Sequence, residues 1–246
     1  MRRISKLFLS LIIISQACSD GSGTPLDLGG GPDPKDPTPS TSDVILDFSE
    51  FGPGDTITSS QGVAISLAAR GVNCADAVIA FDTSDPPGST GDDLDLGAPN
   101  KAFGGPGVGA GGRPGPFQND RPLGNVLVIQ EDPALEDENP SPMDDCDGGG
   151  TVVFDFSELS ASGVRVSLVT VLDVDNKQQA KSEFRLYGSN DELLANVNPP
   201  ITKPNGVARM SFDGISGVLR MEVEEKISVA IAEIAVDLPS VEETSS

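Results

Sequence analysis

The sequence predicts an all-β protein: an antiparallel β-sandwich or jelly roll of about ten strands with a long Gly/Asp-rich loop. Three observations predict this fold class. Gly contributes 28 and Pro 20 of the 246 residues, too many backbone breakers for a mainly helical chain. Short β-branched runs recur after residue 43, each bounded by Gly, Pro, Asn or Asp. No helical pattern separates these runs, as expected for an antiparallel sandwich.

An export signal is predicted over residues 1–17. Basic residues precede a short apolar run at 7–14, which falls well below the roughly 20 apolar residues needed to span a bilayer. The small residue before Cys18 resembles the bacterial lipoprotein cleavage box, in which the cysteine becomes the lipidated first residue. Ser15 departs from the usual Leu of that box. Ordinary cleavage near Ala17, giving a secreted protein, is the alternative.

This signal predicts where the protein acts. We expect export to the bacterial outer membrane or cell surface, with the membrane as a partner through the lipid on Cys18. Residues 18–42 then form a linker that is too rich in Gly and Pro to bury a core. It would extend by about 3 Å per residue at its Pro-rich end. The sandwich is expected to occupy 43–239, followed by a disordered tail at 240–246.

Ten segments of the sandwich are expected to be strands. Val164, Val166 and Leu168 show the period of two that places one face in a core and the other in water. The expected strands are 44–48, 62–67, 77–81, 125–130, 151–156, 164–174, 184–187, 207–212, 218–223 and 227–238.

Charge and composition exclude several classes of function. Lys and Arg number 16 against 38 Asp and Glu, a net charge of −22 that repels phosphate backbones, so no nucleic-acid partner is expected. The absence of His excludes serine triads and H-E-x-x-H metal sites. Residues 107–112 match G-x-G-x-x-G, but Arg113-Pro114 follows where a dinucleotide-binding loop requires a helix. Carboxylate chemistry, hard cations and simple binding remain.

The chain contains three cysteines. If Cys18 carries the lipid, Cys74 and Cys146 form an even pair in an oxidising compartment. Both lie in polar, Gly/Asp-rich surroundings, which favours a disulfide between them. The alternative is two separate buried thiols.

Two acidic loops indicate a metal. A disulfide between the two cysteines would bring the loop that begins at Asp82 and the loop before residue 151 to one end of the sandwich. Closely packed carboxylates repel unless a cation neutralises them, and oxygen ligands on turns suit Ca²⁺. The sequence therefore predicts Ca²⁺ as a cofactor, with solvated loop acids as the alternative. The expected ligands are Asp82, Asp92, Asp93, Asp95, Asp145 and Asp147.

Several segments together resemble a known kind of bacterial domain. They are F-D-T-S-D-P-P-G-S-T-G-D-D-L-D-L-G-A-P-N, G-G-P-G-V-G-A-G-G, L-G-N-V-L-V-I-Q-E, D-G-G-G-T-V-V-F-D-F and V-T-V-L-D-V-D. This order resembles an extracellular domain of secreted surface proteins, many of which carry C-terminal sorting tails of the PEP-CTERM kind. The resemblance covers most of 43–239 and implies a galactose-binding-like jelly roll, mostly without an assigned activity.

The resemblance also implies a second place for calcium. In related carbohydrate-binding jelly rolls a structural Ca²⁺ often joins acids of the first and last strands. By that analogy the candidates are Asp47 or Glu50 in the first strand and Glu233 or Asp237 in the last.

Three functions compete at this point. The favoured one is a non-catalytic surface module that binds a glycan or a cell-envelope protein and is stabilised by calcium. The alternative is a purely structural or matrix protein without a small ligand. A less favoured one is a carboxylate-only hydrolase, which needs two acids about 5 to 9.5 Å apart in a cleft. No catalytic residue is assigned. The lack of Trp and the single Tyr187 weigh against sugar stacking, although Phe103 and Phe117 offer rings in the Gly-rich loop.

Overall fold

The computed structural model describes residues 43–86, 93–132, 134, 145–175, 179–212, 214–226 and 229–240. The predicted signal peptide, Cys18 and the linker lie outside these ranges. Within them, no helix is both long enough and apolar enough to cross a membrane.

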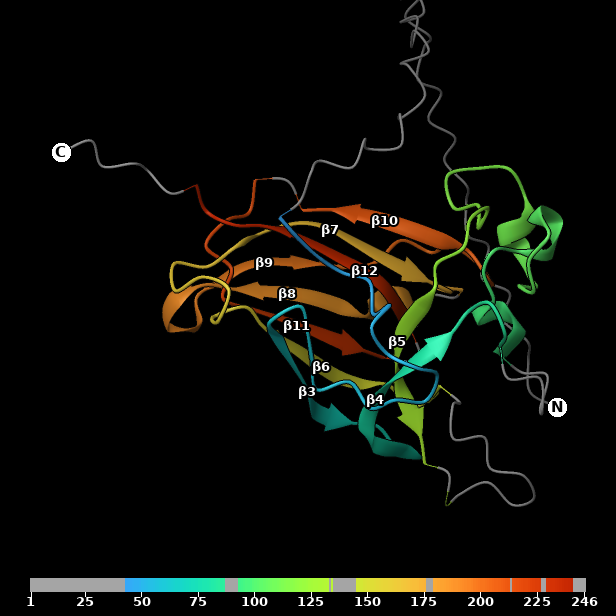
Figure 1. Cartoon of the computed structure of the whole chain (residues 1–246), viewed down its shortest axis with the longest axis horizontal. Coiled ribbons are helices and arrows are strands. Elements are labelled where there is room, and N and C mark those ends of the chain that lie inside the picture. Colours follow the sequence, from blue (N-terminus) through green and yellow to red (C-terminus); the bar gives the residue numbers. More distant parts are fainter. Residues whose placement is uncertain are drawn as a thin grey trace, which may run out of the picture. The chain divides into compact units, whose positions relative to one another are not determined.

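In the described residues, twelve strands form two antiparallel sheets, which confirms the predicted all-β sandwich (Figure 1). The first sheet has the order β10-β7-β12-β5-β4. The strand β5 pairs with β12 at Ile231, and β1 pairs with β12 at residues 234–236. The second has the order β2-β3-β6-β11-β8-β9. The first sheet contains β1 (Val44–Leu46), β4 (Cys74–Asp82), β5 (Asn125–Glu131), β7 (Arg165–Leu172), β10 (Val207–Ser211) and β12 (Ala230–Asp237). The second contains β2 (Ser59–Ser60), β3 (Val63–Arg70), β6 (Gly150–Asp155), β8 (Glu183–Tyr187), β9 (Leu193–Val197) and β11 (Arg220–Glu225).

All ten expected strands are present, and two more were missed. The strand β9 has a weak alternation and pairs only with β8 at the edge of its sheet, so little apolar patterning marks it. The strand β2 is two residues long, which is below what periodicity can detect.

Five short 3₁₀ helices connect the strands in the described ranges. They are η1 (Asp93–Leu96), η2 (Lys101–Phe103), η3 (Ala110–Gly112), η4 (Gln179–Lys181) and η5 (Ser189–Asp191). Three of them lie in the long loop between β4 and β5.

The core lies between the sheets and follows the period of two in β11. Met221 and Val223 are buried, whereas Glu222 and Glu224 alternate with them on the outer face. The first sheet departs from the expected one-sided burial, because β4, β5 and β12 are buried on both faces. Leu96 of η1 joins a second apolar cluster there with Phe81 and residues of β5, β7 and β12. The loop therefore covers the outer face of the first sheet.

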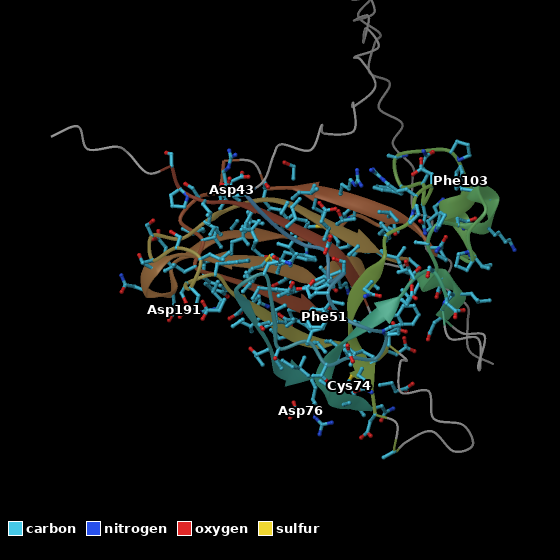
Figure 2. The ribbon with its side chains drawn as sticks, in the orientation of Figure 1. Asp43, Phe51, Cys74, Asp76, Phe103 and Asp191 are labelled. Carbon is cyan, nitrogen blue, oxygen red and sulfur yellow. A yellow bond between two sulfur atoms is a disulfide. The ribbon has the colours of Figure 1, made fainter. Side chains whose placement is uncertain are left out.

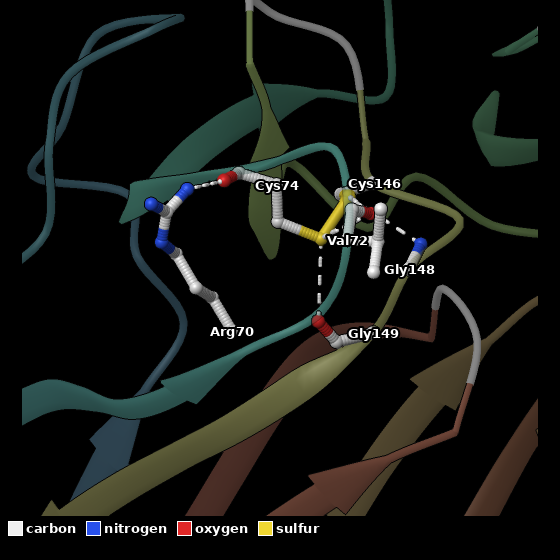
Figure 3. Close-up of a disulfide and its surroundings, with 6 residues drawn as sticks. All are labelled: Arg70, Val72, Cys74, Cys146, Gly148 and Gly149. Carbon is white, nitrogen blue, oxygen red and sulfur yellow. Dashed lines mark hydrogen bonds between the residues drawn. A yellow bond between two sulfur atoms is a disulfide. The ribbon is translucent and has the colours of Figure 1, made fainter.

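A disulfide joins Cys74, at the start of β4, to Cys146, with an S–S distance of 2.05 Å (Figure 3). The structure thus confirms the predicted pairing. The bond spans a sequence separation of 72 residues, and closing a loop of that length stabilises a fold by about 4 kcal/mol in the chain-entropy model. The guanidinium of Arg70 donates a hydrogen bond to the Cys74 carbonyl oxygen beside it.

Candidate functional site

The Gly-rich loop, defined here as residues 93–124, is an ordered structure held against the connection between β9 and β10 (Figure 1). The Val207 backbone N–H at the start of β10 donates to the Phe117 carbonyl oxygen at 3.1 Å. The Gly111 N–H donates to the Pro204 carbonyl oxygen, also at 3.1 Å. Ala98 N–H donates back to the Thr83 carbonyl oxygen at 2.8 Å. Two of these three hydrogen bonds join residues at least ninety positions apart in the chain.

Three buried asparagines hold the loop in place: Asn100, Asn119 and Asn205. Asn100 Nδ2 donates to Asn205 Oδ1 at 2.6 Å. Asn205 Nδ2 donates to the carbonyl oxygens of Asp95 and Gly97 at 2.7 and 2.6 Å. Asn119 Nδ2 donates to the same Gly97 oxygen at 3.0 Å. These bonds satisfy backbone carbonyls that the irregular loop leaves without a strand partner, which is why the loop can be buried at its base.

Glycine is needed where the loop meets this connection. A Cβ on Gly111 would lie 1.9 Å from the Asn205 carbonyl oxygen. Gly109 has φ +155°, and a Cβ there would lie 2.4 Å from the Pro204 carbonyl oxygen. Side chains at these two positions would push the loop off the β9–β10 connection.

The outer surface of the loop carries several exposed cations, and Asp120 near its C-terminal end is exposed as well. Lys101 and Arg113 lie on η2 and immediately after η3, and Lys203 comes from the connection against which η3 packs. All three are exposed, and none forms an ion pair with another described residue. Phe103 is 40% exposed among them, at the outer rim of the loop (Figure 2). We call Lys101, Phe103, Arg113 and Lys203 the cationic face.

Beneath the loop lies an acidic cluster centred on Asp173, the residue after β7. Its side chain is 8% exposed, and its Oδ1 accepts a hydrogen bond from the Asn205 backbone N–H at 2.6 Å. The pKa of Asp173 is raised to about 8, chiefly by burial and then by the neighbouring carboxylate of Asp95. Burial also raises the pKa of Asp95, as do the charges of Asp175 and Asp147. Acids of both predicted acidic loops therefore lie close enough to interact electrostatically in this cluster.

Glu225, at the end of β11, extends this cluster into the core. Its side chain is 4% exposed and its Oε1 has no hydrogen-bond partner among the described residues. Burial raises the pKa of Glu225 well above its ordinary value, and the carboxylate of Asp145 contributes in the same direction.

The predicted calcium ligands do not form one site in the described residues, where no group of three or more acidic or cysteine side chains could hold a metal ion. Asp82, the last residue of β4, caps the turn that follows, since its Oδ1 accepts from the N–H and hydroxyl of Ser84 at 2.8 and 2.7 Å. Asp95, Asp145 and Asp147 share the acidic cluster. Asp93 is buried within η1, and Asp92 lies outside the described residues. Calcium binding therefore stays a prediction.

The second predicted place for calcium, between the first and last strands, has the expected topology. The strand β1 pairs with β12 with Leu46 opposite Ile234, so Asp47 and Glu233 follow at the next positions. Asp47 Oδ1 accepts from the N–H and hydroxyl of Ser49 at 3.1 and 2.7 Å. Of the alternatives, Asp237 forms an ion pair with Arg165, and Glu50 accepts from Ser60 Oγ at 2.6 Å.

The only tyrosine of the chain lies on the outer face of the second sheet. The Arg220 guanidinium lies 4.4 Å from the centroid of the Tyr187 ring and also pairs with Asp191. Arg185 joins Glu183 and neighbouring acids of β11 in ion pairs. One face of the Tyr187 ring is therefore covered by a cation–π contact, whereas the Phe103 ring is 40% exposed.

The fold and this loop define an antiparallel β-sandwich that carries a rigid surface loop. No protein-family model and no curated protein matches the chain. Among solved structures it is similar to a fucose-binding module, SpX-3, of Streptococcus pneumoniae, at 14% identity. That match covers 38% of this chain and 69% of the module, with a TM-score of 0.27. A likeness of this size supports no inference about what this chain binds.

Sequence reasoning did not find the residues that build the site. Asn100, Asn119 and Asn205 belong to turn-like segments in which asparagine is ordinary. Asp173 belongs to a D-x-D segment at 173–175 that lacks the EF-hand pattern. Neither 96–119 nor 193–212 contains an acidic residue, but 56–75, which lies outside the site, contains none either, so this pattern alone does not locate the site.

Proposed function

We propose that the protein is an exported, non-catalytic surface module that uses the Gly-rich loop of its sandwich to bind a glycan of the cell envelope. The observation that carries this proposal is the loop itself. It is exposed on its outer side, yet its base is locked by three buried asparagines. A loop ordered before binding does not lose conformational freedom when a ligand arrives, so its contacts translate into affinity.

The distribution of perturbed acids favours binding over catalysis. Among the described residues, Asp173 and Glu225 are the carboxyl groups whose pKa is raised most. Such shifts are common in general acids, but these side chains are 8% and 4% exposed. Asp173 is also engaged by the Asn205 N–H under the loop. A glycosidic bond would have no access to either group, which weighs against the carboxylate-only hydrolase.

The place of action follows from the N-terminal segment. A lipid on Cys18 would hold the sandwich at the outer membrane or cell surface, with 18–42 as a tether. The disulfide supports an oxidising compartment. Calcium would then act by neutralising the acids around Asp95 and Asp173.

A glycan array tests the binding role. The full chain with Cys18→Ser, which removes lipidation, is screened against envelope glycans with and without Ca²⁺. We expect retention of a subset of glycans and weaker retention by Phe103→Ala. Val72→Ala is the matched control, because Val72 is 81% exposed in the turn between β3 and β4, outside the Gly-rich loop. Failure to retain any glycan would favour the structural or matrix alternative.

A further inference from the structure

The cationic face is an exception on an acidic molecule. The chain carries a net charge of −22, yet the two segments that form this face, 96–119 and 193–212, contain no Asp or Glu. Hydrogen bonds from Gly111 to Pro204 and from Val207 to Phe117 bring these two segments together. The fold therefore places these two acid-free segments side by side.

The cations of this face are available to a ligand. Lys101, Arg113 and Lys203 are exposed and form no ion pair with any other residue of the described ranges. In contrast, Arg165, Arg185 and Arg220 each pair with a carboxylate. Unpaired cations on a fixed backbone attract anionic groups without first having to break an internal ion pair.

The exposed ring of Phe103 gives the cationic face a place where a carbohydrate chain could stack. Phe103 is followed by Gly104 and Gly105, so little side-chain bulk surrounds the exposed ring. An aromatic ring in an open surface can stack on the apolar face of a sugar while neighbouring cations meet its charged groups.

We infer that the cationic face binds an acidic polysaccharide, a glycan that bears carboxylate or sulfate groups; this inference rests on the proposed glycan-binding function. A second copy of this chain is the competing partner. Two copies at −22 repel each other over the rest of their facing surfaces, whereas an extended polysaccharide can follow the acid-free surface alone. At physiological ionic strength screening acts over about 8 Å, so the local charges decide the contact.

Two matched pairs of probes test the inference by calorimetric titration of the full chain with Cys18→Ser. Polygalacturonate is compared with its methyl ester, and dextran sulfate with dextran, so that charge changes and the sugar backbone does not. We expect at least one anionic member to bind about tenfold more tightly than its neutral partner, and the pair that shows this preference identifies carboxylate or sulfate as the recognised group. Its affinity should fall as NaCl is raised.

The variants place the binding on this face. Lys101→Gln, Arg113→Gln and Lys203→Gln together should weaken anionic binding by about tenfold, as expected for the loss of three exposed ion pairs. The matched control is Lys181→Gln, an exposed lysine of η4 outside this face, which should bind like the parent chain.

Other outcomes overturn the inference in distinguishable ways. Equal binding of charged and neutral members, unchanged in the triple variant, refutes the cationic face and leaves the proposed glycan-binding function standing. Absence of binding to these probes and to every glycan of the array refutes both. Equal affinity for single-stranded DNA refutes the assignment to glycans. Concentration-dependent self-association that the triple variant abolishes assigns the face to a second copy instead.

Discussion

Replacement of Asp173 by Asn should change how the stability of the protein depends on pH. The Asp173 carboxyl is buried under the Gly-rich loop, and its pKa is raised from 3.8 to about 8, chiefly by burial and then by Asp95. Asn has the same shape, stays neutral and tolerates the left-handed backbone at this position, where φ is +67°. Its side-chain oxygen can still accept from the Asn205 N–H.

The sign of the effect follows from the raised pKa. The folded state holds the Asp173 proton more tightly than the unfolded state, so the contribution to stability is complete below pH 3.8 and is lost as the pH rises towards about 8. Within that interval each pH unit lowers the free energy of unfolding by about 1.4 kcal/mol. A rise from pH 5 to pH 7 should therefore lower the free energy of unfolding by roughly 3 kcal/mol through Asp173 alone. Glu225 acts in the same direction.

Urea unfolding of the parent chain and of Asp173→Asn at pH 5, 6, 7 and 8 measures this difference. The parent should lose stability steeply over the series, and the variant should lose roughly 3 kcal/mol less between pH 5 and pH 7. Asp76→Asn, an exposed acid in β4, is the control and should keep the parent slope. Parallel slopes for the parent and Asp173→Asn would refute the electrostatic account of this site.

Three further predictions concern the same end of the molecule. Replacing Cys74 and Cys146 together by Ala should lower the free energy of unfolding by about 4 kcal/mol, measured by urea unfolding under oxidising conditions; an unchanged midpoint would contradict it. Asn100→Ala leaves the buried Asn205 Oδ1 without this donor and should lower the free energy of unfolding by about 1–3 kcal/mol. Hydrogen exchange should increase more at the amides of the Gly-rich loop than at those of β11. An equal increase at both would contradict a local role of Asn100 in holding the loop. Millimolar Ca²⁺ should raise Tm at pH 8 and should raise it less at pH 5, because a cation binds the charged form of Asp95 and its neighbours. Identical melting curves with Ca²⁺ and with a chelator at pH 8 would refute calcium binding.

Much of the sandwich was predictable because its strands carry their own pattern. The alternation in β11 places Met221 and Val223 in the core whatever the partner strands are, and the cysteine count predicted the Cys74–Cys146 pair. The two-sided burial of β12 was not predictable from its own residues, since it depends on Leu96 packing from a distant loop.

The candidate site was less predictable for the same reason. Acidic residues drew attention to Asp82 and Asp47, but each of these caps its own turn by binding a serine two positions later. The residues that shape the loop are neutral asparagines whose partners lie far along the chain, as with Asn100 and Asn205. Their roles depend on tertiary contacts, which local patterns do not report.

The bond between Asn100 and Asn205 also sets an order of assembly, since these residues are 105 positions apart. A chain that emerges with its N-terminus first exposes Cys74 and Cys146 long before Asn205. The cysteines can therefore be oxidised while the Gly-rich loop still lacks its partner. We expect the loop to become resistant to proteases only after this disulfide can form, because the loop waits for Asn205 and for the start of β10.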